Sequence, residues 1–284
     1  MSIKLLQPVA IFDSGIGGLT VLRAIHQLLP DQPLIYLADQ AHVPYGSRSL
    51  EEVRQFSEAI TRYLLEQGAS LIVVACNTAS AAALKYLRLI FPDTPFVGME
   101  PAVKPAAEHS LSRVVGVLAT PATFQGELYA SVVERFGQGV KILQETCPGL
   151  VAQIEKGDLD TPATRRILEQ ALTPMLADGI DTIVLGCTHY PFVIPLIQEI
   201  TGPSVRVIDP APAIARQVQR LLVASNLPDL DFNTVPDQSR NIQHLLHFTT
   251  TGDASRLENM LPRLIGEHSP VERLIWQSGQ LIAS

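Results

Sequence analysis

Two cysteines are the residues of this chain with the clearest capacity for chemistry, because each follows a short apolar run rich in β-branched residues. Cys76 follows residues 72–75 and Cys187 follows residues 183–186, and hydroxyl or amide side chains come directly after both. The apolar runs predict buried parallel strands, and the residues behind them predict helix starts. Open α/β folds place their reacting groups at such strand ends.

A thiol at the start of a helix lies beside unpaired backbone N–H groups, which stabilise the thiolate and lower its pKa from about 8.5. One such cysteine suggests a nucleophile, and two suggest a pair. The alternative is that each is a small buried apolar residue, as many cysteines after strands are. The presence of two in corresponding places favours chemistry. Cys147 precedes Pro148 without a counterpart in the other half, so we interpret it as structural.

The composition excludes several classes of protein. The chain has 284 residues, of which 46% are hydrophobic, and this is enough for two domains with strands buried on both faces. A net charge of −7 without a basic run argues against nucleic acid as the main partner. The three cysteines form no C-x-x-C pair and no zinc-like spacing, so we expect reduced thiols and no metal. Without a signal-peptide layout or a lipid-facing segment, we expect a cytoplasmic protein that does not enter a membrane.

The chain alternates between predicted strands and predicted helices, which indicates an α/β fold with mainly parallel sheets. The main predicted strands cover residues 9–12, 34–38, 72–75, 113–118, 140–143, 183–185, 205–208, 244–250 and 271–276, the last as the terminal strand. Predicted helices cover residues 50–67, 79–90, 124–136, 161–177, 209–225 and 253–264, and a loop is expected over 226–241. Prolines after residue 92 predict a domain boundary near 98.

The two halves read as weak repeats, each with a strand, a turn, a helix and a cysteine after a later strand. We therefore expect two pseudo-symmetric α/β domains, residues 1–97 plus 208–284 and residues 98–207, with the cysteines across a cleft from one another. The glycine-rich turn at 13–18 resembles a truncated phosphate loop. It lacks both the G-K-[ST] ending and the G-x-G-x-x-G spacing, which disfavours a nucleotide, although its glycines permit a ligand close to the backbone.

Six segments in the same order resemble the signature segments of the glutamate racemase family. They span nearly the whole chain and read DSGIGGLT at 13–20, VPYG at 43–46, ACNTAS at 75–80, ATPAT at 119–123, GCTHYP at 186–191 and TTGD at 250–253. The resemblance implies two similar α/β domains with the active site between them. It also implies interconversion of L- and D-glutamate without a cofactor, feeding D-glutamate to peptidoglycan synthesis.

The residues make chemical sense of that reaction. Inverting a stereocentre requires a base on one face of the α-carbon and an acid on the other, which Cys76 and Cys187 can supply. Oriented donors must stabilise the developing carbanion, and Asn77, Thr78 and Thr188 are suitable donors for the α-carboxylate. The resemblance further implies the following neighbours: Asp13 and Ser14 beside Cys76 and the substrate ammonium, His189 beside Cys187, and backbone N–H groups of Tyr45 and Gly46 toward the substrate.

Several of these assignments have structural alternatives. Asp13 could be only a turn residue, His189 could cap a helix, and Thr120 could shape a turn instead of contacting substrate. Glu155 could lie at the edge of the site. A racemase of aspartate or another amino acid, an anion-binding protein and a thiol redox protein compete with the glutamate hypothesis. The sequence leaves the oligomeric state open, with a homodimer among the alternatives.

Overall fold

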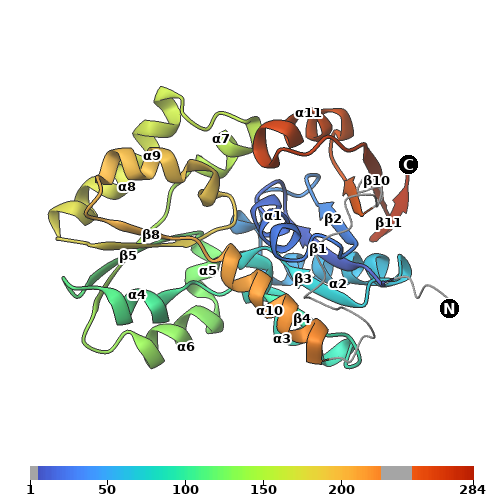
Figure 1. Cartoon of the computed structure of the whole chain (residues 1–284), viewed down its shortest axis with the longest axis horizontal. Helices are drawn as coiled ribbons and strands as arrows, with labels where there is room; N and C mark the ends of the chain where they lie inside the picture. Colours follow the sequence, from blue (N-terminus) through green and yellow to red (C-terminus); the bar gives the residue numbers. More distant parts are fainter. Residues whose placement is uncertain (1–5, 225–244) are drawn as a thin grey trace.

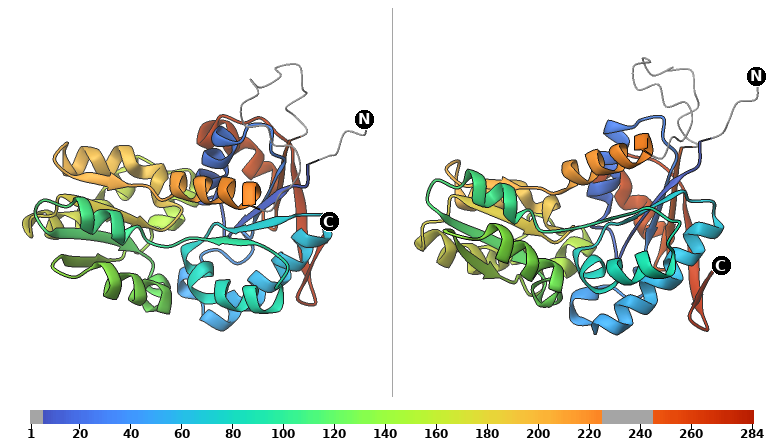
Figure 2. Two further views of the ribbon diagram at one scale, coloured as in Figure 1. Left: turned by 60° about the horizontal axis from the view of Figure 1, so that its bottom comes forward. Right: turned by 90° about the horizontal axis from the view of Figure 1, so that it is seen from below.

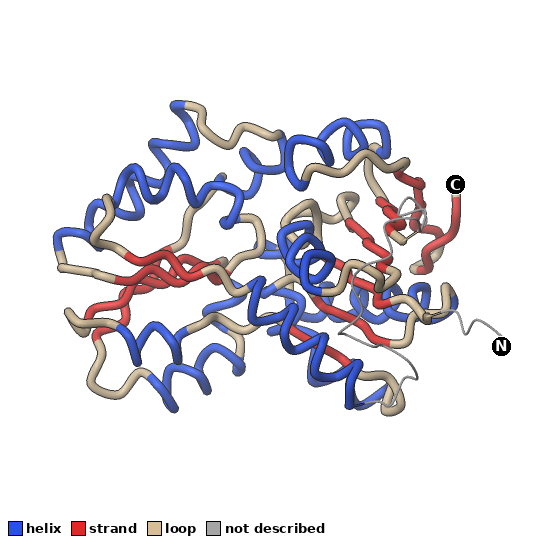
Figure 3. Tube along the Cα trace, in the orientation of Figure 1, coloured by secondary structure: helices blue, strands red, loops and turns tan. Residues whose placement is uncertain are grey.

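A computed structural model describes residues 6–224 and 245–284 of the chain, so the loop expected over 226–241 lies outside the described residues. Strands gather in two separate sheets, each with helices packed on it (Figures 1 and 3). The fold is therefore a mixed α/β fold with mostly parallel sheets, as the sequence predicts. In the part of the chain that the structure describes, no helix combines the length and apolar character needed to cross a membrane.

The first sheet takes its strands from both ends of the chain. The described strands run in the order β11-β10-β9-β2-β1-β3-β4, and among these pairs only β10 and β11 are antiparallel. They are β1 (Val9–Asp13), β2 (Leu34–Ala38), β3 (Leu71–Val74), β4 (Phe96–Gly98), β9 (Leu246–Thr250), β10 (Val271–Gln277) and β11 (Gln280–Ala283).

The second sheet repeats the strand order of the first. Its parallel strands run β6-β5-β7-β8, which matches β2-β1-β3-β4. They are β5 (Val114–Ala119), β6 (Lys141–Glu145), β7 (Thr182–Gly186) and β8 (Arg206–Ile208). Strands β3 and β7 thus hold equivalent places, and Cys76 and Cys187 follow their carboxyl ends. The domain boundaries at 97/98 and 207/208 stay a prediction, with which this division of strands is compatible.

Helices cover both faces of the central strands, which explains why those strands are apolar throughout. Along β1, Val9 and Ile11 enter one core while Ala10 and Phe12 enter another. The first core lies under α1 (Leu19–Leu28), α10 (Ala211–Ala224) and α11 (Ala254–Ile265), and the second under α2 (Leu50–Glu66) and α3 (Asn77–Ile90).

The second sheet is also a middle layer between two sets of helices (Figure 1). One set consists of α7 (Leu150–Lys156), α8 (Pro162–Ala177) and α9 (Ile194–Thr201), and the other of α4 (Val103–His109) and α6 (Glu127–Phe136). The core under α8 and α9 is continuous with the core under α1, so Ile11 and Leu185 belong to one apolar cluster. This shared core joins the two sheets.

Two predicted elements differ in the structure. The helix expected over 124–136 is divided into α5 (Pro121–Gln125) and α6 at Gly126, whose backbone is extended. Glycine fits this junction because a Cβ there would lie 2.7 Å from the Cβ of Ala81 in α3. The strand expected to end the chain continues through a turn at Ser278 and Gly279, both with positive φ, into β11. Figure 2 shows this C-terminal hairpin at the edge of the first sheet, away from the second.

The start of α2 gives a test of the local structure. Ser49 is its N-cap, and Ser49 and Glu52 form a complete capping box, as the sequence predicts. Ser49→Ala should lower the free energy of unfolding by about 1 kcal/mol, because it leaves a helix N–H without a partner. Urea denaturation measures this change. Glu51→Ala in the same turn removes an exposed ion pair to Arg54 and a long hydrogen bond from Gln55 but leaves the cap intact, so an equal loss in that control would contradict the capping explanation.

Candidate active site

A small cavity lies where the carboxyl ends of the strands from the two sheets meet. Its volume is about 20 Å³, roughly the room that one water molecule needs. It brings together all the predicted site residues except Asp13, which is buried next to it. The lining residues are Ser14, Pro44, Tyr45, Gly46, Cys76, Asn77, Thr78, Thr120, Val151, Gly186, Cys187, Thr188 and His189.

Cys76 begins α3 and is its N-cap, so the helix starts at Asn77, two residues earlier than the sequence suggested. The backbone N–H of Ala79 donates to its Sγ at 3.4 Å, which is the thiolate-stabilising contact expected at a helix start. Burial nevertheless raises the pKa of Cys76 well above 9.0, and the negative charge of Asp13 raises it further. The environment therefore favours Cys76 as a thiol in the absence of substrate.

Asp13 lies at the end of β1 and connects the two halves of the site. Its Oδ2 accepts from the backbone N–H of Gly18 at 2.9 Å, and its Oδ1 accepts from the hydroxyl of Thr188 at 3.5 Å. Asp13 is fully buried, and burial raises the pKa of its carboxyl. Asp13 is therefore more than a turn residue, because it contacts both Cys76 and the residue after Cys187.

His189 forms a buried ion pair beside Cys187. Its Nδ1 lies 3.9 Å from Sγ of Cys187, and its Nε2 lies 2.6 Å from Oε1 of Glu155. Burial by itself lowers the pKa of His189, but the hydrogen bonds to Cys187 and Glu155 and the charge of Glu155 outweigh it and raise the pKa well above 6.5. His189 therefore places a protonated imidazole beside Sγ of Cys187.

Glu155 is the site residue that the sequence left at the edge, and it occupies a central position in the structure. Besides His189, its carboxylate accepts from the backbone N–H of Ile16 at 2.8 Å and from Nε2 of Gln40 at 3.0 Å. Burial alone raises its pKa, but these partners, with His189 foremost, lower it below 4.5. A lone glutamate in a short helix carries no spacing signal, so only the tertiary structure identifies this role.

The glycine-rich turn after β1 allows the two halves to approach closely. A Cβ on Gly17 would lie 2.5 Å from Nδ1 of His189, and one on Gly18 would lie 2.8 Å from the Cβ of Asp13. In a similar way, a Cβ on Gly46 would lie 2.9 Å from the Cβ of Thr120. The glycines of this turn therefore serve contact between chain segments far apart in sequence, which accounts for a motif that only partly resembles a phosphate loop.

Polar side chains without partners point to a ligand in this cavity. Both the Oδ1 and Nδ2 atoms of buried Asn77 lack a hydrogen-bond partner among the described residues. Thr78 and Thr120 join the two halves through their hydroxyls, which are 2.9 Å apart, and Thr120 caps α5 through the N–H of Thr123. A buried amide normally has partners, so Asn77 is arranged to receive them from a bound molecule.

The arrangement supplies the components of a two-sided proton transfer. Two thiols come from equivalent strands of two similar sheets, and one has a carboxylate beside it while the other has an imidazolium. Within residues 6–224 and 245–284, no group of three or more His, Cys, Asp or Glu side chains is arranged to hold a metal ion. The chemistry that these residues themselves can perform is general acid–base catalysis by sulfur.

Comparison with known proteins agrees with this geometry. Residues 18–218 match the family described as Asp/Glu/Hydantoin racemase. A glutamate racemase of Roseiflexus sp. is 49% identical over 267 residues, which cover 93% of this chain and 94% of that protein. A glutamate racemase of Pseudomonas aeruginosa PAO1 is 46% identical over 267 residues, covering 94% of this chain and 97% of its own.

Solved structures show the same fold. Glutamate racemase isoform RacE1 from Bacillus anthracis has a TM-score of 0.82 at 30% identity, covering 96% of this chain and 98% of its own. Escherichia coli glutamate racemase has a TM-score of 0.79 at 32% identity, covering 95% of this chain and 98% of its own. The chain therefore belongs to the Asp/Glu/Hydantoin racemase family, groups within it with the glutamate racemases, and is an isomerase of the amino-acid racemase class.

Proposed function

We propose that the enzyme interconverts L- and D-glutamate without a cofactor, using Cys76 and Cys187 as the two acid–base groups. The observation that carries this proposal is that both thiols, from equivalent strands β3 and β7, line one cavity with the unpartnered amide of Asn77. The solved E. coli enzyme was crystallised with L-glutamate, and a Francisella tularensis glutamate racemase, 26% identical to this chain, with D-glutamate.

The partners of each sulfur suggest how the protons are distributed before the reaction. Cys76, buried next to Asp13, holds its proton. Cys187 lies 3.9 Å from Nδ1 of the protonated His189, and in this scheme it serves as the first base. In one direction the Cys187 thiolate takes the α-proton from one face of the substrate, and the Cys76 thiol delivers its proton to the other face. The reaction leaves Cys187 as the thiol and Cys76 as the thiolate, ready for the reverse direction.

The handedness follows from the resemblance to the family. Cys187, supported by His189, removes the proton from L-glutamate, and Cys76, supported by Asp13, removes it from D-glutamate. The resting distribution of protons described above therefore prepares the enzyme for L-glutamate. The proton on His189 is retained throughout in this scheme, because Glu155 stabilises the imidazolium from its other nitrogen.

The remaining residues in the cavity are assigned to holding the substrate. Asn77, Thr78 and Thr188 donate to the α-carboxylate, on which negative charge develops as the α-proton leaves, and Ser14 with Asp13 faces the ammonium. Thr120 joins this set through its bond to Thr78. Backbone N–H groups at Tyr45 and Gly46 hold the distal part of the substrate. Since the cavity measures about 20 Å³, its walls must separate for an amino acid to enter and close again to exclude water.

The wider role follows from the reaction. We propose as well that the enzyme acts in the cytoplasm and that its D-glutamate is used in peptidoglycan synthesis. The alternative is a racemase of aspartate or another amino acid, and the segments at 43–46 and 186–191 favour glutamate. Turnover of L-aspartate at a rate equal to or above that of L-glutamate in purified protein would favour the alternative.

The first test concerns the need for both thiols. Cys76→Ala and Cys187→Ala should each lower kcat by at least about 10²-fold in both directions, because either change removes the acid or base from one face. A chiral assay of glutamate without added cofactor measures this. Cys147→Ala is the matched control, since Cys147 is buried but lies outside the cavity, and we expect activity within about twofold of wild type. Substantial activity in either single variant would rule out the two-thiol mechanism.

A second test assigns the two faces. In D2O, Cys76→Ser retains the thiolate at 187, so α-deuterium should enter L-glutamate slowly without inversion, and Cys187→Ser should label D-glutamate instead. Mass spectrometry after chiral separation reads the label. Labelling of the opposite enantiomer by each variant would reverse the assignment and leave the two-base scheme intact.

A third test concerns the Glu155–His189 pair and pH. The folded pKa of His189 lies above 6.5 and that of Glu155 lies below 4.5. The stabilisation from His189 is thus complete below pH 6.5 and is lost as the pH rises toward its folded pKa. The stabilisation from Glu155 is complete above pH 4.5 and is lost as the pH falls toward the folded pKa of Glu155. The difference in free energy of unfolding between wild type and Glu155→Gln should therefore be largest between these two values.

Urea unfolding of both proteins at several pH values measures that difference. We expect it to narrow as the pH rises above 6.5 and the pair begins to lose the proton on His189. Glu169→Gln is the control, because Glu169 is exposed and pairs only with Arg165 on the surface of α8. A difference for Glu155→Gln that does not vary with pH would contradict a charged His189.

A further inference from the structure

The carboxylate of Asp39, directly after β2, connects the C-terminal hairpin with the loop that lines the cavity. Asp39 is fully buried and receives four side-chain donors on its two oxygens. The hydroxyl of Thr251 donates to Oδ1 at 2.8 Å, and Nε1 of Trp276 donates to the same oxygen at 2.7 Å. On Oδ2, the hydroxyl of Tyr45 donates at 2.6 Å and Nδ1 of His42 at 2.9 Å.

Two of these donors, Tyr45 and Trp276, come from segments that lie far apart in the sequence. Tyr45 is part of the short helix η1 (Tyr45–Ser47) and lines the cavity, whereas Trp276 belongs to β10, which lies between β9 and the edge strand β11 of the first sheet (Figure 2). The ring of Tyr45 is buried, and its hydroxyl is bonded to Asp39. The position of the backbone at Tyr45 and Gly46 therefore depends on how Asp39 is held.

Aromatic contacts join the same two segments. The ring of His42 stacks on Phe56 of α2 at 3.9 Å and meets Trp276 edge-on at 5.0 Å. Phe56 also contacts Tyr45 and Trp276, with ring centroids 5.8 and 5.7 Å apart. Trp276 thus packs against the loop through its ring and bonds to Asp39 through its N–H, and these two contributions can be separated by substitution.

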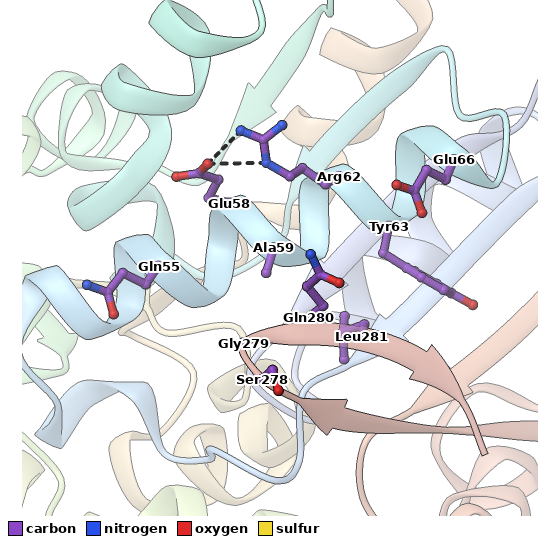
Figure 4. A pocket seen from close by; sticks show the side chains of 10 residues that line it. All are labelled: Gln55, Glu58, Ala59, Arg62, Tyr63, Glu66, Ser278, Gly279, Gln280 and Leu281. Carbon is purple, nitrogen blue, oxygen red and sulfur yellow. Dashed lines mark hydrogen bonds and ion pairs between the residues drawn. The ribbon is translucent and has the colours of Figure 1, made fainter.

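The hairpin has few other anchors near its turn. Leu274 and Leu281 are buried against the sheet, but beyond them a hollow of about 350 Å³ separates the turn from α2. Figure 4 shows this hollow, with Arg62 and Tyr63 of α2 on one side and Ser278 and Gly279 of the turn on the other. The bond from Trp276 to Asp39 is therefore an additional link between this hairpin and the segment that carries Tyr45.

We propose that Trp276 is a positioning residue for substrate binding, which acts through Asp39 on Tyr45 and Gly46. The inference rests on the proposed function, in which the backbone at these two residues holds the distal part of glutamate. Those contacts are equally present in the ground state and the transition state. Weakening them should therefore raise KM and leave kcat unchanged.

Trp276→Phe tests this, because it removes the N–H donor and keeps a smaller aromatic ring against His42 and Phe56. We expect KM to rise roughly five- to tenfold for both enantiomers, with kcat within about twofold, as for loss of one hydrogen bond to a charged acceptor. Ile275→Ala is the matched control, since Ile275 is the neighbouring residue of β10 and is 36% exposed. Its KM should stay at the wild-type value, and an equal rise there would overturn the inference.

A double-mutant cycle with Tyr45→Phe distinguishes positioning from a general structural effect. If Trp276 acts through Asp39 and Tyr45, its substitution has much less effect on KM once Tyr45 no longer bonds to Asp39. If the rise in KM of the double variant Trp276→Phe/Tyr45→Phe equals the product of the rises in the two single variants, the two residues act independently and the inference is overturned. Should Trp276→Phe fail to fold, Asp39→Asn tests the same link, because an amide cannot accept four donors, and it should also raise KM without lowering kcat.

Calorimetric titration of glutamate into each protein separates this inference from the proposed function. If the wild type is active and a folded Trp276→Phe variant has the same KM and Kd as the wild type, the inference about Trp276 is overturned and the proposed function stands. A wild type that neither binds nor racemises glutamate would overturn the proposed function, and the inference with it. A weaker Kd in Trp276→Phe by the same factor as its KM supports the role assigned to Trp276.

Discussion

The site depends on the buried ion pair between Glu155 and His189, because this pair holds together segments that are far apart in the chain. Glu155 also accepts from Ile16 and Gln40, so one carboxylate of the second sheet's helix α7 is bonded to two loops of the first sheet. A carboxylate buried to this extent requires partners for its charge, and the closed arrangement of the two halves supplies them. The same pair keeps a proton on His189 and thereby sets the charge beside Cys187.

The scaffold is nearly symmetric, whereas the chemistry needs a difference between its halves. Equivalent strands β3 and β7 place Cys76 and Cys187 in equivalent positions, which in the proposed mechanism provides one sulfur for each face of the substrate. The partners break that symmetry, since Cys76 has the carboxylate of Asp13 nearby and Cys187 has the imidazolium of His189. In a two-thiol racemase, one sulfur must carry a proton while the other must be able to accept one. If the two thiols had identical surroundings, neither would be favoured as the protonated one. The unequal partners therefore give the resting enzyme a defined state on a repeated fold.

The sequence predicts those features that depend on local patterns. Buried strands, the capping box at Ser49 and the two cysteines after β3 and β7 all follow from short-range periodicity and turn chemistry, and the structure contains them. Glu155 and Asp39 could not be identified in this way, because their partners lie up to 139 and 237 residues away. The hairpin at Ser278 and Gly279 carried a weak signal, since serine is an uncommon residue at positive φ. Gly126, at the break between α5 and α6, lies against Ala81, a contact that no local pattern reports.

The closeness of the two halves also explains why so many small residues surround the thiols. Gly17 and Gly46 each lie where a Cβ would meet an atom of a distant segment at 2.9 Å or less, so the walls touch when the site is closed. A cavity with room for about one water excludes most solvent from the sulfurs, and this strengthens every charge interaction within it. The closed cavity has no room for an amino acid, so the proposed reaction requires the walls to separate and close again. In that cycle, contacts that cross the interface, such as Glu155 to Ile16 and Thr78 to Thr120, must break and reform. The stronger the charge interactions in the closed site, the more free energy opening therefore requires.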